Sequence, residues 1–263
     1  MNFQEIFLKK EKKLKQRWFK MTTLYIVATP IGNLEDLTSR ALRILKEVDL
    51  ILCEDTRVTK KLLERYNIKT QTLSYHQHSK LQKIDYILSL LKQGKNLALV
   101  SDAGTPGISD PGNKLINLIT RPGRVVDEAK SSSPSSLPQV EARSVKIVPI
   151  PGPSAVTAAA SVSGFPMDRF LFLGFPPTKR KRKKFFVEVI NSKYPVIFYE
   201  SPYRIIKTLK ELSFLVGNRE IVVCRELTKK FETIYRGTIE EVLNQLEKSE
   251  IKGEFVVVVE GKK

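Results

Sequence analysis

The sequence predicts an α/β protein with two α/β domains. Apolar strand patterns alternate with helical patterns through most of the 263 residues, which is typical of crossover units in a mostly parallel sheet. The small-residue helix Ala155–Gly164 separates two such series of strands. A loop rich in Gly, Pro and Asp, Ser101–Gly112 (SDAGTPGISDPG), follows an apolar strand. Open α/β sheets usually bind ligands at that end of a strand.

The first half of the chain is expected to form a five-stranded sheet with helices between the strands. In the helix Leu81–Leu91, for example, apolar residues recur at the spacing of one helix face. The other predicted helices are Leu37–Val48, Thr59–Tyr66 and Gly112–Ile119, and the predicted strands are Leu24–Thr29, Leu50–Asp55, Thr70–His76, Asn96–Asp102 and Val145–Pro151.

The second half repeats the alternation and is expected to form a second domain. We place the domain boundary at 167/168, which gives domains of residues 21–167 and 168–263, and the cleft between them is the default ligand site. The predicted helices are Tyr203–Val216 and Ile239–Lys248, and the predicted strands are Arg169–Phe175, Pro195–Ser201, Glu220–Leu227, Phe231–Gly237 and Gly253–Gly261.

Two segments fall outside this pattern. Residues 1–20 hold seven Lys or Arg against two Glu and lack an apolar signal core, so we expect a flexible basic extension ahead of Met21. Residues 120–141 are rich in Ser and Pro and stand where a short connection is usual. We interpret them as a surface insertion, with a lid or partner-binding loop as the alternative.

Charge and cysteine content narrow the class of protein. The net charge of +17 favours a polyanionic partner, most often nucleic acid. Cys53 and Cys224 lie far apart without metal-type spacing, so we expect reduced thiols and a cytoplasmic protein. No apolar run approaches the length needed to span a bilayer.

Three loops should converge on one sheet edge because each follows a predicted parallel strand. They begin at Thr29 (TPIGN), Ser101 and Pro151 (PGPSA). Neither an NTPase P-loop nor a GxGxxG after the first strand is present. The only two histidines, His76 and His78, are too few for a zinc site, so we expect a solvated loop pair and no metal.

Six motifs in order resemble the small-subunit ribosomal RNA methyltransferase I family, a ribose-directed branch of the tetrapyrrole methylase superfamily. They are VATPIGNLEDLTSRAL, CEDTRVTKKLL, SDAGTPGISDPG, PIPGPSAVTAA, FYESPYR and RELTKKFE, and they run from about Leu24 to Gly261. The resemblance implies two α/β domains of the tetrapyrrole methylase type with S-adenosylmethionine (SAM) in the cleft between them. It also implies a homodimer, and 2′-O-methylation of a cytidine in the decoding region of 16S rRNA of the small ribosomal subunit.

The same resemblance assigns the cofactor contacts motif by motif. An Asp acceptor suits the hydroxyl or amine donors of the cofactor, and glycines admit close backbone contact. The implied residues are Thr29, Pro30, Ile31, Asp102, Ala103, Gly104, Thr105, Ser154, Ala155, Tyr199, Arg225 and Gly253. The basic extension and the insertion depart from the family pattern. An insertion that disturbs the strand leading to Pro151 should impair cofactor binding, whereas one that loops outward should leave activity intact.

The chemical step implied is attack of a ribose 2′-hydroxyl on the methyl carbon, in which positioning and proton removal both contribute. Our candidates to orient the ribose or take the proton are Glu54, Arg57 and Glu200. Neighbouring charged residues of the same motifs are further candidates, and each could equally form a structural ion pair. They are Asp55, Arg204, Arg225, Glu226 and Lys229.

A run of six basic residues is interpreted as a loop that contacts RNA phosphates, and the nearby aromatics Phe172, Phe175, Phe185 and Phe186 as core. The run comprises Lys179, Arg180, Lys181, Arg182, Lys183 and Lys184. Two alternatives stay open. One is a methyltransferase of the same fold acting on a small tetrapyrrole, and the other is an RNA-binding protein that has lost cofactor binding.

Overall fold

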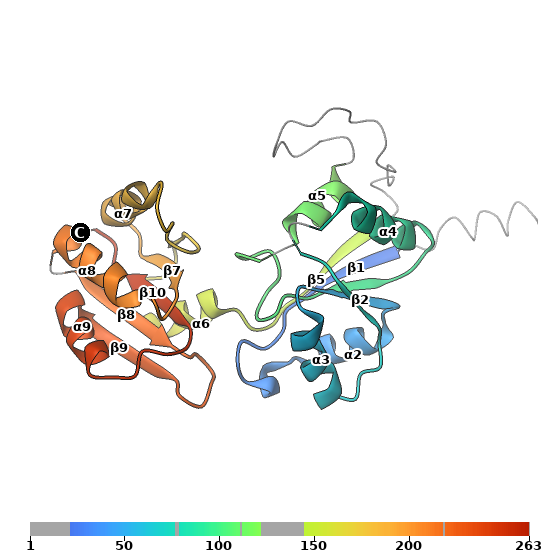
Figure 1. Cartoon of the computed structure of the whole chain (residues 1–263), viewed down its shortest axis with the longest axis horizontal. Coiled ribbons are helices and arrows are strands. Elements are labelled where there is room, and N and C mark those ends of the chain that lie inside the picture. The colour runs from blue at the N-terminus through green and yellow to red at the C-terminus, as the bar shows by residue number, and fades with distance from the viewer. Residues whose placement is uncertain (1–21, 77–78, 111, 122–144, 218, 263) are drawn as a thin grey trace, which may run out of the picture. The chain divides into compact units, whose positions relative to one another are not determined.

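The computed structural model describes residues 22–76, 79–110, 112–121, 145–217 and 219–262, so the basic extension and nearly all of the insertion lie outside the described residues. The chain divides into two compact units (Figure 1). Unit 1 holds the residues up to Thr29 together with Leu37–Gly152, and unit 2 holds Pro30–Asp36 together with Pro153–Lys263.

Unit 1 is built on a five-stranded parallel sheet, as predicted, and its strand order is β3-β2-β4-β1-β5. The central strands are apolar on both sides, which is typical of a sheet covered by helices on both faces. The strands are β1 (Thr22–Val27), β2 (Leu50–Cys53), β3 (Thr72–Ser74), β4 (Leu97–Leu99) and β5 (Val145–Ile150).

Helices cover both faces of this sheet (Figure 1). One apolar cluster joins α2 (Ser39–Glu47) and α3 (Thr56–Arg65) to one face, and another joins α4 (Leu81–Lys92) and α5 (Asn113–Thr120) to the other. Asp55 caps α3 by accepting a hydrogen bond from the Arg57 backbone N–H, which fixes where the helix starts. The carboxyl ends of the strands are left for the loops that carry the candidate site.

Unit 2 contains a mixed sheet in the order β6-β7-β10-β8-β9. Only β6 and β7 are parallel, and the other pairs are antiparallel, so the expected mostly parallel sheet does not occur here. The reason is that β8 and β9 are joined by the short turn 226–232 instead of a crossover helix. The strands are β6 (Leu171–Phe172), β7 (Val196–Glu200), β8 (Glu220–Arg225), β9 (Thr233–Thr238) and β10 (Phe255–Val259).

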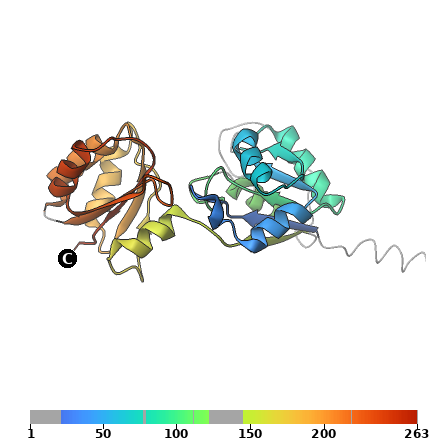
Figure 2. The same ribbon diagram turned by 90° about the horizontal axis from the view of Figure 1, so that it is seen from below.

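The helices of unit 2 lie on opposite faces of this sheet (Figure 2). On one face is α6 (Ala155–Ser163), and on the other are α7 (Arg182–Asn191), α8 (Ile205–Val216) and α9 (Ile239–Glu247). By packing, α6 belongs to unit 2, whereas the sequence placed it in the first domain. A 3₁₀ turn, η1 (Leu34–Asp36), also belongs to unit 2. Among the described residues, no helix is long and apolar enough to cross a membrane.

Helix α7 corrects the prediction that the basic run is a loop. The helix starts at Arg182, so the run splits into a three-residue approach and the first helical turn. The helix has a buried apolar face formed by Phe185, Phe186 and Val189. Packing of this face stabilises the helix, including its charged first turn. The core expectation holds for Phe185 and Phe186, but Phe175 is 53% exposed.

Candidate functional site

The loops after β1 and β4 meet at the carboxyl edge of the unit 1 sheet. Thr29 and Gly104 exchange backbone hydrogen bonds, with N···O distances of 2.9 and 3.0 Å. The buried Thr29 hydroxyl donates to the Ser101 carbonyl at 3.2 Å. Gly104 has φ +81°, a left-handed conformation that glycine adopts without strain. These two predicted cofactor residues are therefore adjacent, and the Thr29 hydroxyl already makes a hydrogen bond within unit 1.

Asp102 joins this loop to the loop after β2. Its Oδ1 accepts a hydrogen bond from the Asp55 backbone N–H at 2.9 Å, and the residue is exposed. Around the junction lies an open pocket of about 580 Å³. Thr56 and Ser74 were missed by the sequence analysis, although Ser74 ends β3 on the same edge. The pocket is lined by Glu54, Asp55, Thr56, Arg57, Ser74, His76 and Asp102.

The pocket carboxylates have different electrostatic environments. Burial, reinforced by the charge of Asp102, raises the pKa of Glu54. Hydrogen bonds from Arg57 lower the pKa of Asp55 to about 2. The Arg57 guanidinium forms an ion pair with Asp55 at 2.6 Å while its side chain stays 87% exposed. The ionised form of Glu54 is thus destabilised, whereas that of Asp55 is stabilised.

His76 is exposed at the pocket, as expected for a solvated loop residue, and His78 lies outside the described residues. Within the described part of the chain, no group of three or more His, Cys, Asp or Glu side chains could hold a metal ion.

The predicted cofactor residues Pro30, Ile31, Ser154, Ala155 and Tyr199 belong to unit 2. One apolar cluster on the α6 face of the sheet contains Ile31, with Ala155 and Tyr199 packed against it. Ser154 is the N-cap residue of α6, and its hydroxyl makes no capping hydrogen bond. The structure therefore brings three of these five residues together through apolar packing.

Arg225 ends β8, and Gly253 lies in the segment just before β10 of unit 2. The Arg225 Nε donates to the Lys252 carbonyl at 2.8 Å. Gly253 has φ +93°, and a Cβ there would lie 2.4 Å from the Glu226 side chain. Lys229 Nζ contacts carboxylate oxygens of Glu226 and Glu254 at 2.9 and 2.7 Å. The predicted candidates Glu226 and Lys229 are thus partners in an ion pair.

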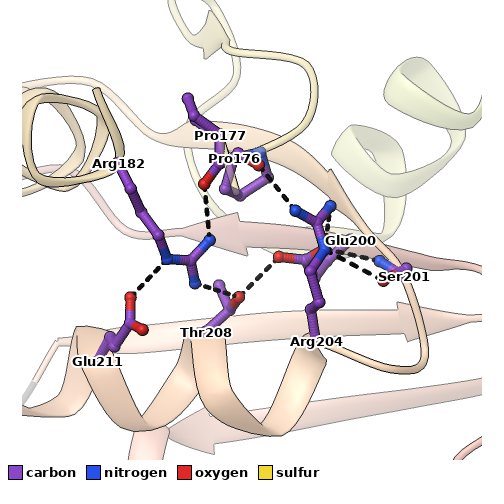
Figure 3. A network of polar contacts seen from close by, with 8 residues as sticks. All are labelled: Pro176, Pro177, Arg182, Glu200, Ser201, Arg204, Thr208 and Glu211. Atoms are coloured by element: carbon purple, nitrogen blue, oxygen red, sulfur yellow. Dashed lines mark hydrogen bonds and ion pairs between the residues drawn. The ribbon is translucent and has the colours of Figure 1, made fainter. Parts of the chain in front are cut away.

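Glu200, predicted as catalytic, is a buried network residue with a side chain that is 0% exposed (Figure 3). Its Oε1 accepts from the Ser201 backbone N–H at 2.8 Å and lies 2.7 Å from an Arg204 nitrogen. Its Oε2 accepts from the Thr208 hydroxyl at 2.6 Å. Both oxygens already have partners inside unit 2, which departs from the predicted role of Glu200 in orienting the ribose or taking its proton.

Arg182 also departs from its prediction, because its side chain is only 12% exposed. The guanidinium donates to Glu211 at 2.7 Å, to the Thr208 hydroxyl at 2.8 Å and to the Pro177 carbonyl at 3.2 Å (Figure 3). The other five basic residues of the run are exposed. Arg182 therefore stabilises the fold, and the exposed five are left as RNA-contact candidates.

Comparisons with known proteins define the class first. The family profile of Tetrapyrrole (Corrin/Porphyrin) Methylases matches residues 23–126 and 133–243. Among solved structures, a diphthine synthase is similar with a TM-score of 0.65 at 15% identity, over 92% of this chain and 91% of that one. A cobalt precorrin-4 methyltransferase is similar with a TM-score of 0.62 at 19% identity, over 93% and 96%. The fold is that of the tetrapyrrole methylases.

Curated relatives narrow the class. The ribosomal RNA small subunit methyltransferase I of Thermotoga maritima is 43% identical over 92% of this chain and 100% of its own length. The protein of that name from Bacillus subtilis is 45% identical over 92% of this chain and 76% of its own length. The chain belongs to the ribosomal RNA small subunit methyltransferase I family.

Proposed function

We propose that the protein transfers a methyl group from SAM to the ribose 2′-hydroxyl of a cytidine in the decoding region of 16S rRNA. The observation that carries the proposal is the 43% identity to the Thermotoga maritima protein, whose name states methylation of small-subunit ribosomal RNA, over its full length. The net charge of +17 supports a polyanionic substrate. A homodimer and a cytoplasmic location complete the proposal.

The residues of the unit 1 edge fit SAM. Asp102 presents an exposed carboxylate, which suits hydroxyl and amine donors, and the left-handed Gly104 lets the backbone come close to a ligand. Bound SAM supplies a methyl group already activated by a sulfonium leaving group. In the proposal the cofactor is held by Thr29, Asp102, Ala103, Gly104 and Thr105 of unit 1 and by Pro30, Ile31, Ser154, Ala155, Tyr199, Arg225 and Gly253 of unit 2.

Glu54 is the proposed acceptor of the 2′-hydroxyl proton. It lies in the same pocket as Asp102, and its raised pKa brings a carboxylate closer to the range in which a general base is effective. The Arg57 guanidinium is paired with Asp55 but stays exposed, so it can also contact a phosphate of the RNA. Together these two side chains would orient the ribose and remove its proton.

Phosphate contacts are assigned to the exposed basic residues at the start of α7. Phosphate binding by Lys and Arg supplies much of the affinity for RNA and makes it depend on salt. The proposed contacts are Lys179, Arg180, Lys181, Lys183 and Lys184.

The test is methyl transfer from labelled SAM to small ribosomal subunits that lack the modification. Label should enter 16S rRNA, and the modified nucleotide should resist alkaline cleavage, because that cleavage requires a free 2′-hydroxyl. Glu54→Gln should retain SAM binding and lose most of the transfer. Label on a base instead of a ribose would refute the proposal.

The two alternatives have their own readouts. Transfer to a small tetrapyrrole but not to the subunits would favour the tetrapyrrole enzyme. An absence of heat on titration with SAM, together with retained RNA binding, would favour an RNA-binding protein that has lost its cofactor.

A further inference from the structure

The buried network around Glu200 holds a loop as well as a helix (Figure 3). Arg204, paired with Glu200 Oε1, donates to the Pro176 carbonyl at 3.0 Å. Arg182, bonded to Glu200 Oε2 through the Thr208 hydroxyl, donates to the Pro177 carbonyl. Two guanidinium groups, one paired with Glu200 directly and the other linked to it through Thr208, therefore bind two consecutive carbonyls. Proline contributes no backbone N–H, so these carbonyls are the groups by which the residues can be anchored.

The anchored carbonyls are separated by one residue, Thr178, from the exposed basic approach to α7, Lys179–Lys181. Lys181 has φ +72°, a left-handed conformation that costs free energy for a residue with a Cβ. Such a conformation persists where contacts of the neighbouring residues hold the backbone in place. The bonded carbonyls of Pro176 and Pro177 provide that constraint before Lys181, and the bonded side chain of Arg182 provides it after.

We propose that Glu200 is a positioning residue for RNA binding: through Arg204, and through Thr208 and Arg182, it fixes the Pro176–Lys181 segment so that its basic side chains are presented to substrate phosphates. This inference rests on the proposed function. It also gives a role to the Glu200 carboxyl group, whose burial in unit 2 is costly unless the group is paired and hydrogen-bonded. Glu200 acts on the segment and does not contact the RNA.

Thr208 allows a matched test. Thr208→Val removes the hydroxyl that links Glu200 to Arg182 but leaves the pair with Arg204, whereas Thr208→Ser retains the hydroxyl. We expect Thr208→Val to weaken binding to unmodified small ribosomal subunits about tenfold and to reduce its salt dependence. Thr208→Ser should stay within about twofold of wild type. SAM affinity and kcat at saturating subunits should change less than about twofold in both variants.

Glu200→Gln is the second variant, and Arg219→Met is the control for a general loosening of α7. Arg219 donates to the carbonyls of Val189 and Ile190 at the far end of that helix, away from the segment. Trypsin cleavage at Lys179–Lys181 without RNA should accelerate about tenfold in Thr208→Val and Glu200→Gln, and not in Arg219→Met.

The outcomes separate this inference from the proposed function. If cleavage accelerates in Thr208→Val while subunit binding stays at the wild-type level, the positioning role is overturned and methyl transfer stands. If Arg219→Met weakens subunit binding as much as Thr208→Val does, general stability explains the effect and the inference fails. If wild-type protein neither binds nor methylates the subunits, both proposals fail.

Discussion

Replacing Asp110 by Asn should stabilise the protein at neutral pH and leave it unchanged in acid. Burial raises the pKa of Asp110 from its ordinary value of 3.8 to about 6, with the charges of Glu54 and Asp102 adding to the rise and a hydrogen bond from Ser101 opposing it. A carboxyl with a raised folded-state pKa contributes its full stability below pH 4 and loses it as the pH passes 6. The full difference corresponds to about 3 kcal/mol. Because Asp110 is partly exposed, solvent screening reduces the expected effect to about 1–1.5 kcal/mol.

Thermal unfolding followed by circular dichroism between pH 4 and 8 measures this effect. Asp110→Asn should raise Tm by about 2–6 °C at pH 8, and the gain should vanish near pH 4, where the wild-type carboxyl is protonated. Asp168, an exposed carboxylate of unit 2, supplies the control through Asp168→Asn, which should change Tm little at any pH. A gain that is equal at pH 4 and pH 8 would refute the electrostatic argument.

Three further predictions concern the site and its supports. Asp102→Ala should abolish the heat of SAM binding but leave affinity for small ribosomal subunits within about twofold of wild type, because the pocket carboxylate is distinct from the basic segment. Serine in place of the five basic residues of 179–184 other than Arg182 should weaken subunit binding and lower the slope of log affinity against log salt by about 0.7 for each phosphate that the variant no longer neutralises; an unchanged slope would contradict the assignment. Gly32→Ala should lower Tm by several degrees, because its Cβ would lie 2.2 Å from Lys229 Cγ and overpacking costs about 1–3 kcal/mol. The same change in a Lys229→Ala background should cost much less.

The unit 1 sheet and the edge at which its loops meet were predictable from local pattern. Each strand is an apolar run followed by a helix with one apolar face, and crossover geometry then requires a parallel sheet. Because parallel strands share a carboxyl edge, the meeting of the loops that carry Thr29 and Gly104 followed from the strand assignments, whereas their direct pairing depends on the strand order. No knowledge of the side chains was needed for that step.

The errors in unit 2 have physical causes. The run at 179–184 was interpreted as a loop because charge hid the apolar face that begins at Phe185. That spacing was a signal available in the sequence. No local signal revealed the network around Glu200, because Arg182, which reaches Glu200 only through the Thr208 hydroxyl, comes from a different helix. Burial of a charged group depends on tertiary contacts, which a single sequence does not display.

The assignment of Pro30–Asp36 to unit 2 has a consequence for synthesis of the chain on the ribosome. Unit 2 is a discontinuous domain: Ile31 fills part of its core, and Thr228 accepts a hydrogen bond from the Asn33 backbone N–H at 3.1 Å. Residues 30–36 are synthesised early, whereas their partners in unit 2, such as Thr228, are synthesised near the end of the chain. Unit 1 can thus complete its sheet cotranslationally, whereas unit 2 must close around a segment already anchored at Thr29 and Leu37. A fragment that begins at Pro153 would lack that part of its own core.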